Sequence, residues 1–114
     1  MPWVVMNEVS PEAEYLYKQA RQKVDNGEYE SAMTILTRVI EMCPTHSHAY
    51  NELGICSGYS DRHEDAVAYY DKAIQADPFH ADAWFNKGMS LKKLGREKEA
   101  QESIEKAIDL YVGR

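Results

Sequence analysis

The stretch AYNELGICSGYSDRHEDAVAYYDKAIQADP, residues 49–78, decides the fold because its pattern recurs along the chain with a period of 34 residues. Shifting the chain by one period places residues of the same kind on one another without any gap. The identical columns are Gly54 and Gly88; Ala32, Ala66 and Ala100; Ile40, Ile74 and Ile108; and Pro44 and Pro78. A period of this length is typical of a solenoid of stacked small units.

Each period reads as two helices. In the second half of the unit, Ala66, Tyr70 and Ala73 recur at helical spacing and form one apolar stripe. Gly27 and Gly95 suit the left-handed residue that ends a helix, and Asp61 in the same column tolerates that conformation. We therefore expect an all-α helical repeat of three antiparallel helix pairs. The predicted helices are 11–26, 28–42, 47–60, 62–76, 81–94 and 96–112.

The columns resemble a known family, the tetratricopeptide repeat, whose 34-residue unit has an aromatic residue, Leu-Gly, Ala, an aromatic residue, Ala and Pro at fixed offsets. The second unit supplies Tyr50, Leu53, Gly54, Ala66, Tyr70, Ala73 and Pro78; the third supplies Trp84, Gly88, Leu91, Ala100, Ile104 and Ala107; the first supplies Leu16, Ala20, Ala32, Leu36 and Pro44. The chain departs from the pattern at Gln19, Lys23 and Lys87. The resemblance implies a superhelix with units 11–46, 47–80 and 81–114, and leaves residues 1–10 outside the register.

The composition excludes several classes of function. The 114 residues carry a formal net charge of −6, which disfavours nucleic acid and anionic membrane surfaces as partners. The start of the chain lacks the features of a signal peptide, and no apolar run approaches the ~20 residues that span a bilayer. Two cysteines without a cysteine framework fit a reducing compartment. We expect a cytoplasmic protein.

The stretch CPTHSHAY, residues 43–50, has the ligand types of a zinc site but superposes on DPFHADAW one period later. It is therefore interpreted as the joint between units, with His46 in a polar loop column, and substitution of His46 and His48 is expected to change stability little. Cys56 is expected to be a buried, inert thiol. No nucleophile, paired acid and base, or phosphate-binding loop stands out, so we expect no catalysis, metal or cofactor.

By resemblance, the first helix of each pair lines a concave groove. The candidate peptide-binding residues are Tyr17, Arg21, Val24, Asn51, Ile55, Tyr59, Phe85, Met89 and Lys92. Several are too apolar for a plain solvated surface, and aromatic residues and Met are common in binding sites. Phe85 is the expected anchor. The alternative is that some of these side chains only fill the seam between helices.

Members of the family that clamp the C-terminal carboxylate of heat-shock chaperones use Lys, Asn and Arg. Here the corresponding positions hold Tyr17, Arg21, Glu52, Asp82 and Asn86, which disfavours that role. Gln101 and Ser103 replace apolar residues of the earlier units and are interpreted as a polar cap on the array.

Two functions remain open. The leading hypothesis is a non-catalytic module that binds a peptide or helix of a partner protein in its groove. The alternative is a structural scaffold that forms a homo-oligomer through its convex face or through the N-terminal segment, which includes the apolar residues Trp3 to Met6. Light scattering at several concentrations, with and without residues 1–9, separates the two.

Overall fold

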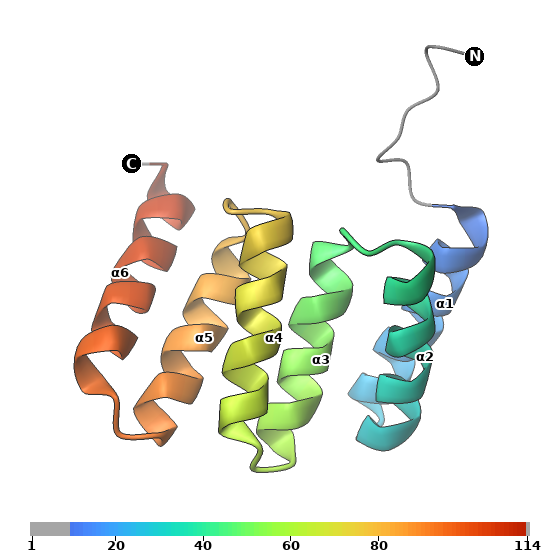
Figure 1. Cartoon of the computed structure of the whole chain (residues 1–114), viewed down its shortest axis with the longest axis horizontal. Helices are drawn as coiled ribbons and strands as arrows, with labels where there is room; N and C mark the ends of the chain where they lie inside the picture. Colours follow the sequence, from blue (N-terminus) through green and yellow to red (C-terminus); the bar gives the residue numbers. More distant parts are fainter. Residues whose placement is uncertain (1–9, 114) are drawn as a thin grey trace.

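The computed structural model describes residues 10–113, and these residues form six α-helices and no strand. The helices are α1 (Pro11–Asp25), α2 (Tyr29–Met42), α3 (Ser47–Tyr59), α4 (His63–Ala76), α5 (Ala81–Lys93) and α6 (Glu97–Val112). Successive helices run antiparallel and stack as three pairs along the long axis of the molecule (Figure 1). The predicted all-α repeat is confirmed, with every helix boundary within one residue of its predicted place. Apart from Ser10, the N-terminal segment lies outside the described residues.

The first helix begins at a strong capping site. Ser10 has extended backbone geometry, and its Oγ accepts a hydrogen bond from the Ala13 amide at 3.1 Å. Pro11 follows at the first helical position, where its missing N–H costs nothing. Glu12 and Glu14 lie in the first turn, where negative charge interacts favourably with the helix dipole. These local signals fix the start of α1.

The turn inside each pair requires a left-handed residue. Gly27 and Gly95 have φ of 77° and 78°, as their column predicts. Asp61 occupies the equivalent place in the second pair with φ of 61°, and it is the non-glycine residue with positive φ in the described chain. Short polar side chains tolerate this region better than others. The column therefore sets the same sharp turn in all three pairs.

Close approach of the two helices explains the small residues of the repeat. A Cβ atom on Gly54 would overlap the ring of Tyr70, and one on Gly88 would meet Ile104 Cγ1 and lie 3.0 Å from the carbonyl oxygen of Ala100. The alanines of the shared column, Ala32, Ala66 and Ala100, are at most 1% exposed. The core is thus a seam of small residues between helices, flanked by larger side chains.

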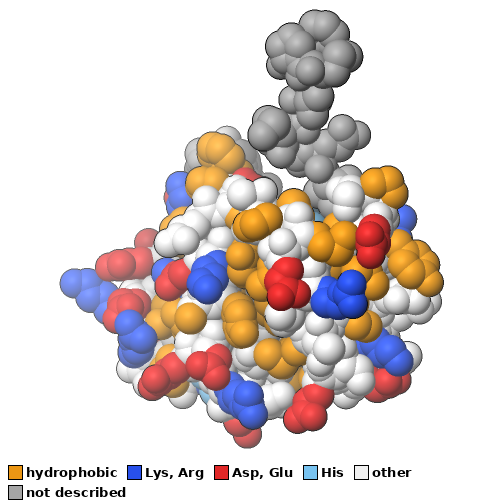
Figure 2. Space-filling model, turned by 45° about the vertical axis from the view of Figure 1, so that its right-hand side comes forward, with side chains coloured by type: hydrophobic (Ala, Val, Ile, Leu, Met, Phe, Trp, Pro, Cys, Tyr) orange, Lys and Arg blue, Asp and Glu red, His pale blue; other side chains and the backbone are white. Residues whose placement is uncertain are grey.

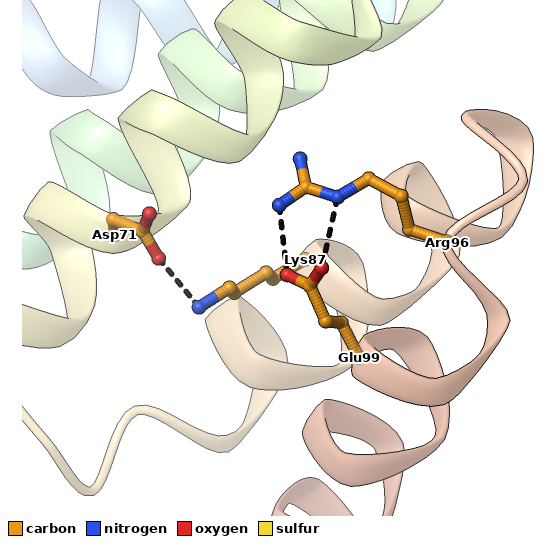
Figure 3. Close-up of polar contacts among 4 residues, drawn as sticks. All are labelled: Asp71, Lys87, Arg96 and Glu99. Carbon is orange, nitrogen blue, oxygen red and sulfur yellow. Dashed lines mark hydrogen bonds and ion pairs between the residues drawn. The ribbon is translucent and has the colours of Figure 1, made fainter.

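Lys87, which stands where the repeat pattern has Leu, is accommodated by an ion pair between helices. Its Nζ lies 2.7 Å from Asp71 Oδ1 of α4 (Figure 3). The same nitrogen is 5.6 Å from the centre of the Trp84 ring. Figure 3 also shows Arg96 and Glu99 forming a two-bond pair of 3.1 and 2.8 Å at the start of α6. The charge of Lys87 therefore joins the second and third units, and its ammonium group lies over the Trp84 ring.

The predicted polar cap is only half correct. Gln101 is exposed, as a capping residue should be. Ser103, however, is only 4% exposed. Among the described elements α6 contacts only α5, so this buried serine faces the interior of its own pair and not the end of the array. Its small size suits that contact, and the outward polar face is carried by Gln101.

Candidate functional site

Curvature of the array places the first helix of each pair on the inside. Within residues 10–113, α1 contacts α3 and α3 contacts α5, whereas α2, α4 and α6 make no such contacts with one another. In Figure 1 the second helices α2, α4 and α6 form one layer and the first helices the other. Helices that touch must lie on the shorter, inner side of a bend, so α1, α3 and α5 form the concave face.

Two adjoining open hollows lie on this concave face and together form the groove. One, of about 530 Å³, is lined from α1, α3 and α5 with Tyr29 of α2. The other, of about 510 Å³, is lined from α3 and α5 with Asp61, His63 and Tyr70. The two hollows share Ile55, Tyr59 and Asn86 and are therefore continuous. A trough of this size can take the side chains of a peptide but not a folded domain.

Most of the candidate binding residues line the groove. Its lining includes Arg21, Val24, Asn51, Ile55, Tyr59 and Met89. Three candidates line neither hollow. Tyr17 packs against the α2–α3 loop, with its ring 4.8 Å from that of His46. Phe85 is 39% exposed and lines neither hollow, and Lys92 lines a separate hollow of about 490 Å³ with residues of α6. Lys93, one residue further, lines the groove instead.

Several groove residues were missed by reading the first helices alone. Asp25 shares a repeat column with Tyr59 and Lys93, and all three line the groove. Tyr29 and His63, each the first residue of a second helix, also share a column and both line it. These residues occupy two columns of the repeat: the last residue of the first helix in each pair and the first residue of the second helix. The repeat register could therefore have predicted them.

Two stacked tyrosines, Tyr29 and Tyr59, belong to the lining of the groove. The rings of Tyr29 and Tyr59 are stacked at 5.0 Å with an interplanar angle of 5°. Tyr59 is nevertheless 70% exposed, and Met89 across the groove is 42% exposed. Large apolar side chains that are left open to solvent in one groove are a feature of binding surfaces.

The polar side chains in the groove are paired with one another. Glu52 is only 5% exposed, and its Oε2 lies 3.4 Å from Arg21 Nη1. Burial raises the pKa of Glu52 above its usual value, and the charge of Arg21 acts in the opposite direction. Asn86 Nδ2 donates to Asn51 Oδ1 at 3.2 Å. Arg21 and Asn86, two of the five positions compared with the chaperone clamp, thus already have partners within the chain.

The histidines near the joints need a correction. His46, which the sequence placed in a polar loop column, is only 7% exposed and is not a surface residue. His80, one period later, is equally buried. His46 Nδ1 accepts the Ala49 amide at 3.0 Å and so caps α3, and burial lowers the pKa of its ring. His80 Nδ1 is 2.7 Å from Ser47 Oγ, which donates to the Ala73 carbonyl at 2.8 Å. In residues 10–113 no three His, Cys, Asp or Glu side chains are placed to hold a metal ion.

Replacing His46 by Ala is therefore expected to lower the free energy of unfolding by about 1 kcal/mol, the usual cost of losing a helix cap. The matched control is His48→Ala, because His48 is exposed and accepts no capping bond. Its unfolding free energy should stay within about 0.5 kcal/mol of the wild type. Urea denaturation followed by circular dichroism measures both. Equal losses in the two variants would contradict the capping role.

Cys56 has the environment of a structural thiol. It is fully buried in α3, as expected from its column, and burial raises the pKa of the thiol to about 11. A thiol with so high a pKa is not a thiolate at neutral pH and is a weak nucleophile. Cys43, the other cysteine, is half-buried and also a free thiol.

Of the six helices described, none has the length and apolar character that crossing a membrane requires.

Models of the tetratricopeptide repeat family match the chain at residues 14–46, 47–80 and 69–102. An uncharacterized protein of Methanocaldococcus jannaschii is 45% identical over 53 residues, which are 46% of this chain and 62% of the relative. The small glutamine-rich tetratricopeptide repeat-containing protein 2 of Saccharomyces cerevisiae is 26% identical over 103 residues, which are 90% of this chain and 30% of the relative. The chain matches less than two thirds of the length of either relative.

Solved structures share the fold. The TPR domain of Sgt2 from Aspergillus fumigatus superposes with a TM-score of 0.88 and 22% identity over 95% of this chain and 72% of that one. The second TPR of Spaghetti (RPAP3), solved with the HSP90 peptide SRMEEVD, superposes with a TM-score of 0.84 and 21% identity, covering 88% of this chain and 93% of that one.

Proposed function

Because this chain belongs to the tetratricopeptide repeat family, we propose that it is a non-catalytic interaction module whose concave groove binds a peptide or helix of a partner protein. One observation carries the proposal. Ile55, Tyr59 and Met89 present apolar surface from two successive first helices to one continuous groove. We also propose a cytoplasmic location, which the two free cysteines support.

The geometry of the groove favours binding over a purely structural role. Tyr59 and Met89 are too exposed to contribute much to folding, yet Tyr59 is held by stacking on Tyr29. A pre-positioned aromatic side chain loses little conformational entropy when a ligand covers it. Several structural neighbours are peptide-binding repeats, and the RPAP3 domain is one that was solved with its peptide. A ligand that covers these side chains would remove their apolar surface from water.

An array of random peptides of about 15 residues, roughly four helical turns, tests the proposal. Each sequence is synthesised both with a free C-terminal carboxylate and as the amide. The strongest ligands are then titrated in solution by fluorescence anisotropy against the wild type and against groove variants. We expect Tyr59→Ala and Met89→Ala each to weaken binding about tenfold, as loss of a central apolar contact does.

The control for these variants is Phe79→Ala. Phe79 is 76% exposed and lies in the loop between α4 and α5, outside the groove lining. Its removal should leave affinity within about twofold of the wild type, as expected for a residue outside the contact. An array without ligands, or ligands that tolerate both groove variants, would refute peptide binding in this groove.

A further inference from the structure

The charges of the groove select among peptides. The hollow that adjoins α1 is lined by three carboxylates and one guanidinium, and the guanidinium of Arg21 is already paired with Glu52. Asp25 and Asp82 form no ion pair with a cation of the described residues there, although the charge of Arg21 also acts on Asp25 from a distance. One guanidinium against three carboxylates leaves this hollow with net negative charge. Asp82 accepts a hydrogen bond from the hydroxyl of Tyr111, which leaves its negative charge in place.

The adjoining hollow is different in character. Its lining has one aspartate and one lysine, Asp61 and Lys93, and Asp61 Oδ1 lies 3.5 Å from His63 Nε2. Ile55, Tyr59 and Met89 supply apolar surface in the same hollow. On the face of the molecule shown in Figure 2, by contrast, acidic and basic side chains are interspersed and no patch of one sign forms. The groove therefore combines one acidic compartment with one apolar compartment, side by side.

We propose that the occupant of the groove is a basic peptide segment with an apolar anchor, not a peptide that ends in acidic residues and a free carboxylate. Its cationic side chains lie against Asp25 and Asp82, and the apolar side chain enters beside Tyr59 and Met89. Complementary charge speeds association and rejects partners of the wrong sign. The inference rests on the proposed function and names the chemistry of the ligand.

Among the described residues of the hollow that adjoins α1, an acidic terminal carboxylate finds no cation that is free of a partner. Arg21 is held by Glu52, and the Asn86 amide donates to Asn51. Breaking the Arg21 pair to free the guanidinium would leave the buried Glu52 carboxylate without its partner, which is costly. Of the residues that the structure describes, the other lysine or arginine in the lining is Lys93, which lies in the other hollow. A peptide such as SRMEEVD would therefore meet like charge where its carboxylates need donors.

The peptide array tests this chemistry directly. We expect the strongest ligands to carry net positive charge and to bind as well in the amide form as with a free carboxylate. The double charge reversal Asp25→Lys with Asp82→Lys should weaken these ligands about tenfold, and the loss should shrink as salt is added. The heptapeptide SRMEEVD, titrated alongside, should not bind the wild type measurably.

The matched control is Glu41→Lys with Glu102→Lys. It makes the same change in net charge on exposed residues of α2 and α6 that line neither hollow. Its affinity should stay within about twofold of the wild type at each salt concentration, because only charges near the ligand act through the screened solvent. Circular dichroism verifies folding of both doubles, and the single variant Asp25→Asn serves if Asp25→Lys with Asp82→Lys does not fold.

The outcomes separate this inference from the proposed function. Acidic ligands, ligands that lose binding as amides, or basic ligands indifferent to the charge reversal would each overturn the inference. If such ligands still depended on Tyr59 and Met89, peptide binding in the groove would stand while its charge preference fell. If the array yielded no ligand at all, both would fail together.

Discussion

Replacing Tyr70 by Ala is expected to lower the free energy of unfolding by about 3–5 kcal/mol, the usual range for deleting a buried aromatic ring. Tyr70 is 3% exposed and lies on α4 with its ring against Gly54 of α3. The glycine leaves a space that only this ring fills, so truncation opens a cavity that the two helices cannot close without shifting. Urea denaturation followed by circular dichroism measures the loss.

Tyr70→Phe is the control for this prediction, since it keeps the ring and removes only the hydroxyl. Burial raises the pKa of that hydroxyl above its usual value, so it stays neutral at ordinary pH and no charge is lost with it. We expect this variant within about 1 kcal/mol of the wild type, the net worth of one neutral hydrogen bond at most. A small loss for Tyr70→Ala would show that the contact between α3 and α4 is not a principal source of stability.

The second large effect is expected from Ala66→Leu, which should destabilise the fold by about 1–3 kcal/mol through overpacking. Ala66 is fully buried in the seam where α4 meets α3. Three additional carbon atoms have no free space there and must push the helices apart or adopt a strained rotamer. The loss is read from the thermal melt and from urea denaturation.

Ala68→Leu provides the comparison on the same helix. Ala68 is exposed, so the added side chain projects into solvent and helix propensity changes little. Its stability should remain within about 0.5 kcal/mol of the wild type. Equal effects at positions 66 and 68 would mean that the buried alanine column is not a close helix contact.

The helices were predictable because their signals are repeated and local. The turn inside each pair rests on a column of three residues, Gly27, Asp61 and Gly95, so one atypical member does not displace the register. The residues that escaped prediction depend on contacts between units. Nothing in the sequence near Lys87 indicates that Asp71, one helix earlier, would pair with it at 2.7 Å.

The sequence predicted which helices line the groove, but not how deeply each of their side chains is buried. Column positions place Asn51 and Arg21 on the concave side, yet Asn51 is only 6% exposed because Asn86 of the next unit covers and bonds it. The prediction for His46 was wrong for a related reason. Its loop column indicated a solvent-exposed side chain, but its ring accepts the Ala49 amide and caps α3. Burial of a polar side chain depends on its partner, and the partner lies in another turn or another unit.

The most direct test of the groove is to map a bound peptide on the protein by nuclear magnetic resonance. The strongest ligand from the peptide array would be titrated into labelled protein, and the amide and methyl signals followed residue by residue. Peptide binding in the groove predicts that the signals of Ile55, Tyr59 and Met89 move together and saturate with the affinity measured by anisotropy. Shifts confined to the outer faces of α2, α4 and α6, with these three residues unchanged, would contradict it.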